Sequence, residues 1–426
     1  MANKEFDVIV YGATGFTGAL VARYLLQEPE SLPDAPSAIK WAIAGRSTKK
    51  LQAVKDQLKL KVSSVDAAVI DAIPVVVADS NDEKQLVDMV LKTKVVLTVV
   101  GPYQLYGEAL VKACAENGVH YCDLTGETLW VDRMMHKYDA AAKKSGAILI
   151  NCCGFDSVPS DLTTLLLTDA VKTYKKSKTS KVSIYFTDLD TGLSGGTLAS
   201  AFANFDNSTS AELTRMGDPF HLIDEKNHEE KKVAGLIQAN KSSLGISYEA
   251  DLGRWSSFFF GGDVNAAVVH RSNFLKKSAY GDKFVYRERL AAGGLFKQIV
   301  MTISVLVFNF LLYFSVTRNV VRRLVPKPGE GPSEEVMQNG KLVAKGVAYN
   351  DTGDLVARST TIGTGDPFYS MTSKVIAETA MCLAKDEIAN VDVKKGGFFT
   401  PAYSVGAHLA KRLHEKRIMT IDIRTV

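Results

Sequence analysis

A short apolar run followed by a glycine-rich turn is the feature that most constrains the fold of this chain. Residues 8–11 are apolar, and Gly12, Gly15 and Gly18 follow them in a G-x-x-G-x-x-G turn. In such a turn the first glycine permits the tight bend, the second lets backbone approach a pyrophosphate, and the third lets helix and strand pack closely. The helix that begins here would direct unpaired N–H groups and its positive dipole end at phosphates. The sequence therefore predicts a dinucleotide-binding βαβ unit, and a glycine-rich turn without a ligand is the alternative.

Apolar strands alternate with helical stretches over the first 150 residues. After residues 8–11 the expected strands are 41–44, 74–78, 95–100, 119–122 and 147–152. Parallel neighbours need crossover connections, which helices supply, so the alternation predicts a doubly wound parallel sheet. From Gly154 onward helices mix with alternating strands. We expect an α/β protein with an N-terminal Rossmann domain over 1–154, a mixed α/β substrate or dimerisation domain over 155–402, and a C-terminal helix–strand pair over 403–426 that returns to the core.

The residues after the second strand indicate which dinucleotide is bound. An NAD site has a carboxylate here, which accepts hydrogen bonds from the ribose 2′-hydroxyl. This chain has Gly45-Arg46-Ser47 instead, followed by two lysines. A guanidinium can grip a 2′-phosphate bidentately, whereas a carboxylate would repel it. The sequence thus predicts NADP(H) rather than NAD(H), and an Arg46 that only caps an exposed turn is the alternative.

Further cofactor contacts are expected where the other strands end. Asp79 ends the third strand, where it either accepts from the adenine amino group or caps the following helix. Gly101 follows the fourth strand, at the edge where open α/β sheets collect ligands, although a bare turn would have the same sequence. The predicted cofactor residues are Gly12, Thr14, Gly15, Phe16, Thr17, Gly18, Arg46, Ser47, Asp79, Gly101, Pro102 and Tyr103.

Six stretches carry a family resemblance: residues 11–18, 41–47, 100–108, 122–127, 154–161 and 396–402. The string Gly-Phe-Asp-Ser-Val-Pro-Ser-Asp over 154–161 is much more particular than the glycine turn. Together they resemble the saccharopine dehydrogenase-like oxidoreductases, which include the mycobacterial trans-acting enoyl reductases. The resemblance implies an NADP-type Rossmann domain, an inserted mixed-sheet domain, oxidoreductase activity and, in eukaryotic members, association with lipid droplets or mitochondria. It supplies no catalytic residues.

Candidates for a proton donor are the polar residues near the carboxyl ends of the strands: Tyr103, Tyr106, Asp123, Glu127, Asp156 and Ser157. Tyr103 would protonate an enolate or amine beside the nicotinamide, stack on its ring, or pack in the core. Asp156 and Ser157 either cap the helix that follows or reach a ligand, and Glu127 is divided between the same two roles. His120 lies within a strand and is expected to be structural. No metal-ligand spacing and no Ser-His-Asp order stands out.

Residues 299–316 form an uncharged apolar segment, preceded by Lys297 and followed by Arg318, Arg322 and Arg323. As a helix it would be about 27 Å long, just short of a hydrocarbon core. The alternatives are packing in a core or dimer interface, a spanning helix, and insertion into one face of a membrane. The flanking arginines suit anionic headgroups, and the soluble character of both ends favours insertion from one face.

Charge and cysteine content limit the classes of partner and the cellular compartment that we expect. The net charge of +4 is too small a bias for a nucleic-acid-binding protein. Five cysteines without a C-x-x-C pair, and a start without a signal or transit segment, indicate reduced thiols in an intracellular protein that is not secreted. We expect a small-molecule or lipid substrate and a lipid-droplet or membrane surface, with a mitochondrial location and a homodimer left open.

The leading hypothesis is a membrane-associated NADP(H)-dependent oxidoreductase that reduces a C=C or C=N bond of a lipid-related substrate. One alternative is a non-catalytic nucleotide-binding scaffold or redox sensor on lipid surfaces. A second is a soluble saccharopine-type amino-acid dehydrogenase. That enzyme would need several convergent Arg or Lys groups for its amino-dicarboxylate, and no such set can be identified in the middle of the chain.

Overall fold

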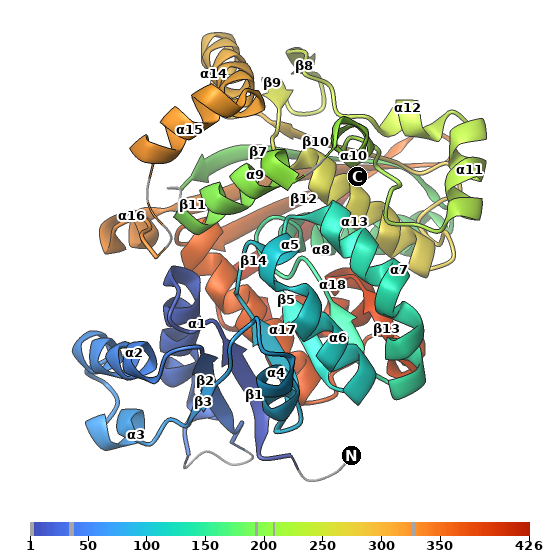
Figure 1. Ribbon diagram of the computed structural model, residues 1–426. Helices are drawn as coiled ribbons and strands as arrows, with labels where there is room; N and C mark the ends of the chain where they lie inside the picture. Colours follow the sequence, from blue (N-terminus) through green and yellow to red (C-terminus); the bar gives the residue numbers. More distant parts are fainter. Residues whose placement is uncertain (1–3, 34–37, 192–194, 208, 326, 328) are drawn as a thin grey trace.

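The computed structural model describes residues 4–33, 38–191, 195–207, 209–325, 327 and 329–426. Within them, two seven-stranded sheets organise the chain, the first in the lower half of Figure 1 and the second above it. The predicted α/β class, with a Rossmann-like parallel sheet and a second mixed sheet, is confirmed.

The first sheet is parallel throughout and has the strand order β13-β6-β5-β4-β1-β2-β3. Its central strands are buried apolar runs, which is what a sheet covered on both faces requires. All six predicted strands are present, and β13 is a seventh that pairs with β6. The strands are β1 (Phe6–Tyr11), β2 (Trp41–Gly45), β3 (Val75–Val77), β4 (Thr93–Thr98), β5 (His120–Asp123), β6 (Ile148–Ile150) and β13 (Gly397–Phe399).

Helices cover both faces of the first sheet. Most of them are crossovers between consecutive strands: α1 (Phe16–Gln27), α2 (Thr48–Lys61), α3 (Ala67–Asp71), α4 (Glu83–Val90), α5 (Tyr103–Tyr106), α6 (Glu108–Asn117) and α7 (Thr128–Ser145). One comes from far along the chain: α17 (Thr372–Ala384) packs against α1, β1, β4 and β5. The first sheet is therefore completed by residues close to the C-terminus.

The second sheet is mixed, with the order β14-β12-β11-β7-β10-β9-β8. Only β7 and β10 run parallel, and its other pairs are antiparallel. Helix α8 (Val158–Lys175) packs across β7, β11, β12 and β14. The strands are β7 (Thr179–Asp190), β8 (Ser247–Glu249), β9 (Arg254–Phe258), β10 (Val285–Leu290), β11 (Lys341–Asn350), β12 (Leu355–Thr364) and β14 (Met419–Thr425).

The remaining elements are mostly helices between strands of the second sheet. They are α9 (Gly195–Asn207), α10 (Ser210–Met216), α11 (Glu225–Val233), α12 (Leu236–Asn240), α13 (Gly262–Leu275), α14 (Leu295–Tyr313), α15 (Ser315–Leu324), α16 (Glu334–Asn339), α18 (Pro401–Ser404), α19 (Gly406–Glu415) and the short turns η1 (Pro29–Ser31), η2 (Pro367–Met371) and η3 (Val391–Lys395). The apolar segment predicted as one unit is divided at Phe314 between α14 and α15. Among the described residues, α14 is the one helix long and apolar enough to cross a membrane.

The boundaries predicted at residues 154 and 402 do not separate independent cores. One hydrophobic cluster runs from Val8 on β1 through Val182 on β7 to Met419 on β14. The return to the first sheet also begins with α17 and β13, which lie before residue 402. The predicted C-terminal helix–strand pair is α19 and β14, and β14 joins the second sheet by pairing with β12.

Charged side chains join the N-terminal region to the C-terminal helices in a cluster that we call the seam: Glu28, Glu30, Glu378, Arg412 and Lys416. Glu378 on α17 is fully buried, and Arg412 on α19 donates to it over 2.5 Å. Arg412 also pairs with Glu30, and Lys416 pairs with Glu28 and Glu30. A buried charge is costly unless it is paired, so this matching holds the two ends of the chain together.

Candidate functional site

The glycine turn has the geometry that its sequence requires. Gly12 has φ +92°, and a Cβ there would lie 2.7 Å from Cγ2 of Val100. A Cβ at Gly18 would lie 2.2 Å from the carbonyl oxygen of Gly12, so only glycine lets α1 approach the turn this closely. Gly15 precedes α1, and no side chain caps that helix. The first N–H groups of α1 therefore remain available for a phosphate.

The other residues of the turn differ in exposure. Thr14 is exposed, and Phe16 and Thr17 are half-buried. The Phe16 ring packs edge-on against Tyr369, with 5.4 Å between centroids. A Cβ at Gly331 would lie 2.5 Å from the same ring, so the chain before α16 passes directly over Phe16. The Phe16 side chain thus anchors the turn to the rest of the protein, so Phe16 can contact a cofactor only through its backbone.

Arg46 and Ser47 lie at the end of β2, next to the turn in the sheet. Arg46 is exposed and makes no hydrogen bond or ion pair with any described residue, so the alternative of a turn-capping arginine has no support in the structure. Ser47 caps α2 by accepting from the Lys50 N–H over 3.4 Å. Burial raises the pKa of Tyr11 to about 12; nearby Asp79 raises it further, whereas Arg46 lowers it. Because both Asp79 and Arg46 act on Tyr11, the last residue of β1, the two charged side chains lie near the end of that strand.

Asp79 does not cap the helix that follows it. Its Oδ1 accepts from the backbone N–H of Asn81 at 2.9 Å and from that residue's side-chain amide at 3.2 Å. The helix cap is Asp82, which accepts from the Gln85 N–H over 3.1 Å. The predicted capping alternative is therefore wrong for Asp79, because the chain makes one more turn before α4 begins.

Gly101 and Tyr103, which follow β4, have different environments. Gly101 is exposed and Pro102 is half-buried, as a backbone edge for a ligand requires. Tyr103 is 3% exposed, its ring packs against Trp130, and its hydroxyl donates to the Thr98 carbonyl over 3.1 Å. Burial, with the charge of Asp123, raises its pKa well above its usual range. Of the three roles considered for the Tyr103 side chain, core packing is the one observed, and proton donation is contradicted.

Glu127 and His120 are structural. Glu127 accepts from the backbone N–H groups of Tyr103 and Gln104, at 3.0 and 2.9 Å. It therefore caps α5 rather than the helix that starts beside it, a contact between distant residues that local sequence does not predict. Nδ1 of His120 accepts from the Ile148 N–H over 3.1 Å, and burial lowers the histidine pKa to about 4. The structural role predicted for His120 is confirmed. Tyr106, another of the proton-donor candidates, is exposed on α5.

Asp123 fixes the turn that follows β6. It is fully buried and accepts from the Tyr121 hydroxyl, the Thr125 N–H, the Asn151 amide and the Cys152 N–H, at 2.7–3.1 Å. Burial raises its pKa to about 6, although these four donors oppose the rise. Cys152 has φ +61°, a left-handed conformation that a non-glycine residue rarely adopts without support. Asp123 supplies that support and so positions the segment that leads to Asp156.

Asp156 and Ser157 lie on this turn, at the start of α8. Ser157 occupies the cap position but makes no capping hydrogen bond, and its hydroxyl is buried without a partner. Asp156 is half-buried and makes no hydrogen bond with a described residue; its Oδ2 lies 3.4 Å from where a Cβ at Gly126 would be. Burial raises the Asp156 pKa to about 6. Among the six candidates for the proton donor, Asp156 alone combines access with a carboxyl group whose pKa is about 6.

A buried carboxyl near this turn was not predicted. Glu288 on β10 accepts from the Ser160 hydroxyl at 2.5 Å, the Asn265 amide at 2.7 Å and the Tyr286 hydroxyl at 3.0 Å. Burial raises its pKa to about 7 despite these donors, and Asp156 is among the charges that act on it. Ser160 on α8 and Glu288 on β10 are 128 residues apart in the sequence. No local sequence pattern therefore indicates the cluster.

The turn, the free helix end and the exposed Arg46 fit a dinucleotide with a 2′-phosphate. The first sheet supports this, because its order read from β3 is 3-2-1-4-5-6, with the turn at the point where the order reverses. The fold and site therefore define a Rossmann-type dinucleotide-binding protein.

Comparison with known proteins assigns the family. Residues 8–150 match the saccharopine dehydrogenase NADP-binding domain. A Mycobacterium tuberculosis protein named as a candidate trans-acting enoyl reductase is 32% identical over 421 residues, covering 96% of each chain. The trans-acting enoyl reductase of Mycobacterium ulcerans is 30% identical over 99% of each chain. The chain belongs to this saccharopine dehydrogenase-like family and is an NADP-binding oxidoreductase.

A solved structure supports the fold. The apo form of Saccharomyces cerevisiae saccharopine dehydrogenase (L-Glu forming) aligns with 99% of this chain and 100% of its own, with a TM-score of 0.50. At 12% identity this similarity concerns the arrangement of the two sheets alone.

Proposed function

We propose that this protein is an NADP(H)-dependent reductase of a C=C or C=N bond in a lipid-related substrate, and that α14 holds it on a membrane or lipid-droplet surface. The glycine turn beside the unpaired Arg46 is the observation that carries the cofactor part. The names of the mycobacterial relatives favour a C=C bond, since they are enoyl reductases. A reduced nicotinamide supplies the hydride when bound, and the protein supplies positioning and a proton.

In this proposal the turn holds the pyrophosphate, Arg46 and Ser47 hold the 2′-phosphate, and Asp79 receives the adenine amino group. The backbone of Gly101 and Pro102 lies along the nicotinamide side of the same edge. Asp156 follows β6, which lies two strands from β4, so Asp156 and Gly101 both follow the carboxyl ends of strands at the same edge of the first sheet. A proton donor with a pKa of about 6 is well matched to work near neutral pH.

The apolar helix α14 supports the lipid part of the proposal. Phe296, Val307 and Phe310 are exposed by 79%, 51% and 62%, although the Phe310 ring makes an edge contact with Phe314. Three polar side chains of the helix bond its own backbone. Thr302, Ser304 and Asn309 each donate to the carbonyl four residues earlier, at 2.8–2.9 Å. A helix whose polar groups are satisfied internally can enter an apolar phase at little cost.

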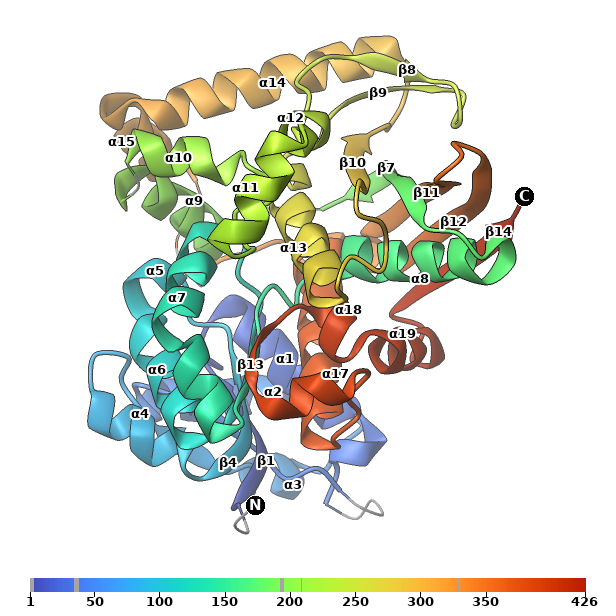
Figure 2. The same cartoon turned by 90° about the vertical axis from the view of Figure 1, so that its right-hand side faces the viewer.

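Both ends of α14 are attached to the body, which favours a helix lying along the lipid surface. Near its start, Gln298 is buried and bonds the Ser257 hydroxyl at 2.6 Å and the Ala292 carbonyl at 2.8 Å. Near its end, Leu312 packs with Leu198 and Phe202 of α9. Figure 2 shows α14 lying flat across one side of the molecule, beside β8 and β9. A spanning helix would have to release one of these ends.

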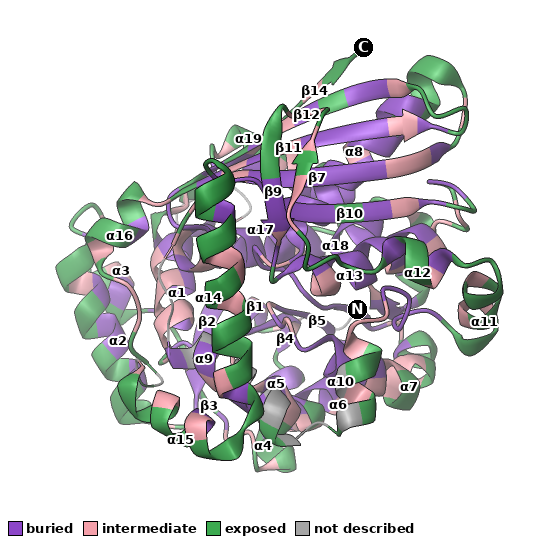
Figure 3. Ribbon diagram, turned by 90° about the horizontal axis from the view of Figure 1, so that it is seen from above, coloured by how far each residue is buried: buried purple, intermediate pink, exposed green. Residues whose placement is uncertain are grey.

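Neighbouring residues suit the same surface. Tyr248 and Trp255 on β8 and β9 are exposed and contact each other, with 5.5 Å between ring centroids. Such residues are enriched where proteins meet a membrane interface. The exposed Lys297 and Arg323, on either side of the apolar stretch, can contact anionic headgroups. In Figure 3 α14 is mostly green, that is, exposed, along its length.

Cofactor binding is tested with NADPH and NADH titrations followed by nucleotide fluorescence. Arg46→Ala should weaken NADPH binding about 10- to 100-fold, because a charge-assisted contact to the 2′-phosphate is lost. NADH binding should be unchanged. Arg424→Ala, an exposed arginine on β14, is the matched control and should alter neither. An unchanged preference for NADPH in Arg46→Ala would contradict the 2′-phosphate assignment, and no NADPH binding at millimolar concentration would favour the scaffold alternative.

Reduction is tested by following NADPH consumption with a long-chain enoyl thioester. Asp156→Asn should lower the rate about 100-fold or more while leaving NADPH affinity unchanged. In the wild type kcat/KM should fall as the pH rises above about 6, because Asp156 then loses its proton. The same pH dependence in Asp156→Asn would exclude Asp156 as the donor.

Flotation with liposomes tests the lipid part. The protein should float with phosphatidylcholine vesicles and bind more strongly when phosphatidylserine is included. Absence from the floating fraction in both cases would contradict the proposal.

A further inference from the structure

A cavity of about 300 Å³ lies between α8, the loop after α13 and the segment that connects α17 to α18. Its lining includes Lys172, Lys276 and Tyr280, and we call it the Tyr280 cavity. Lys172 is 14 residues along α8 from Val158, which corresponds to about 21 Å. The cavity is therefore remote from the turn that carries Asp156 and from the cofactor edge of the first sheet.

Tyr280 is built firmly into the wall of this cavity. Its backbone N–H donates to Asn273 Oδ1 over 2.9 Å, and its carbonyl accepts from the Thr179 N–H over 2.7 Å. Its ring contacts Phe284 at 5.6 Å between centroids. The side chain is 2% exposed, yet its hydroxyl has no hydrogen-bond partner among the described residues. Such an unpaired buried hydroxyl costs free energy, which a ligand in the cavity would recover.

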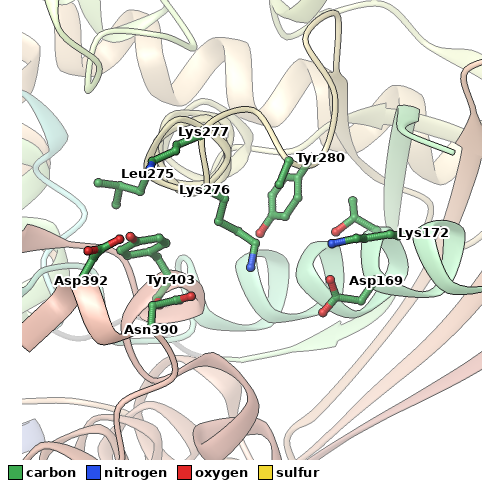
Figure 4. Close-up of a pocket in the computed structure, with 11 residues that line it drawn as sticks. Asp169, Lys172, Leu275, Lys276, Lys277, Tyr280, Asn390, Asp392 and Tyr403 are labelled. Carbon is green, nitrogen blue, oxygen red and sulfur yellow. The ribbon is translucent and has the colours of Figure 1, made fainter. Parts of the chain in front are cut away.

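Two lysines converge on the same space. Figure 4 shows the ammonium groups of Lys172 and Lys276 and the hydroxyl of Tyr280 directed toward the middle of the cavity. Within the described part of the chain neither ammonium group lies within 4 Å of a carboxylate oxygen, although both act on the charge of Asp169. Two ammonium groups and one hydroxyl without a partner among the described residues are a complementary set for the oxygens of an anion.

Two carboxylates, Asp169 and Asp392, also line the cavity, and only one of them is paired with a lysine. Asp392 is already paired with Lys395 at 2.7 Å. Asp169 has no such partner; burial raises its pKa, while Lys276 and Lys172 act to lower it. Asp169 therefore competes with an incoming anion for the two lysines, and its removal should improve binding.

We propose that the Tyr280 cavity binds a small organic anion through its carboxylate or phosphate oxygens, with Tyr280, Lys276 and Lys172 as the binding groups. A volume of 300 Å³ is at the small end of ligand pockets and limits the ligand to a compact molecule. The site is independent of the nucleotide edge and adds a second binding function to the protein.

The test uses the full chain, with succinate and inorganic phosphate as separate probes at constant ionic strength. Binding is measured by calorimetric titration and by the rise in Tm. At least one probe should bind, and the one that does distinguishes a carboxylate from a phosphate ligand. Lys276→Met should weaken binding about tenfold, and Asp169→Asn should tighten it severalfold. Lys175→Met, on the same helix but outside the cavity lining, should have no effect.

Tyr280→Phe separates a binding role from a structural one. Because the hydroxyl has no hydrogen-bond partner among the described residues, its removal should leave the Tm of the ligand-free protein unchanged or raised, while binding falls about 3- to 10-fold. The proposal is overturned if neither probe binds at tens of millimolar, or if Tyr280→Phe and Lys276→Met bind as the wild type does. Unchanged NADPH binding in these variants would confirm that the cavity is separate from the cofactor site.

Discussion

In the seam charged side chains are buried or half-buried, whereas α14 leaves apolar side chains in solvent. Each charge of the seam is matched inside the chain, as Arg412 is by Glu378 and Glu30. The apolar residues of α14, such as Phe310, remain largely exposed. The seam is thus a finished intramolecular contact, and α14 presents a surface that another phase would complete. Completeness of contact, rather than residue type, distinguishes the structural seam from the binding surface that we propose for α14.

The largest effect is expected from breaking the seam. Arg412→Met would leave the buried Glu378 carboxylate without its main partner, which should lower the free energy of unfolding by about 3–5 kcal/mol. Urea denaturation measures this loss. Arg424→Met, which removes an exposed ion pair with Asp422, should change stability by less than about 0.5 kcal/mol. Equal effects of the two variants would show that the seam is no more than a surface ion-pair cluster.

The complementary change places charge on α14. Val307→Asp combined with Phe310→Asp should lower liposome binding at least about 100-fold, because two inserted apolar side chains are replaced by hydrated carboxylates. The Tm should move little, since both residues are exposed in the free protein. Leu60→Asp on α2, where an exposed leucine is far from α14, should leave liposome binding intact. If the double variant floats like the wild type, α14 is not the lipid contact.

Acid should affect the two regions differently. Burial raises the Glu30 pKa, but the hydrogen bond from Lys385 and the charges of Arg412 and Lys416 outweigh this and lower it to about 2 from 4.5. The stabilisation from Glu30 is therefore complete above pH 4.5 and is lost as the pH falls toward 2. In Glu30→Gln the urea midpoint should depend less on pH between 4.5 and 2 than it does in the wild type.

Residues 298–312 of α14, in contrast, carry no titratable side chain. Liposome binding through this helix should be constant between pH 5 and 8 with neutral lipids. A steep change in that range would point to another contact surface.

The smallest effect is expected from making α14 more apolar. Asn309 already donates to the Val305 carbonyl over 2.9 Å, so only part of its polarity remains to be removed. Asn309→Leu should strengthen liposome binding by a few fold without changing Tm. Weaker binding would indicate that the Asn309 amide contacts a partner or headgroup directly.

The first sheet and the nucleotide turn could be predicted from the amino-acid sequence. Strand-forming apolar runs, helical crossovers and the glycine trio are local patterns, and each acts through neighbouring residues. Gly12 and Gly18 show why, because a side chain at either position would collide with atoms of the same turn or the adjacent strand. The apolar character of α14 and the presence of a cation at Arg46 were equally evident.

Which polar side chains are free to bind a ligand, and which are engaged in structural hydrogen bonds, depends on the packing of the folded chain. Tyr103 and Glu127 stand near strand ends in the sequence, but burial and hydrogen bonding make both structural. The seam, the Glu288 cluster and the strand β13 join residues separated by more than 100 positions, and the Tyr280 cavity joins α8 to the segment before α18. Such contacts depend on how helices and sheets pack, which residue spacing along the chain does not encode. The sequence showed which chemical groups the protein has, and packing determined which of them remain available to bind a ligand.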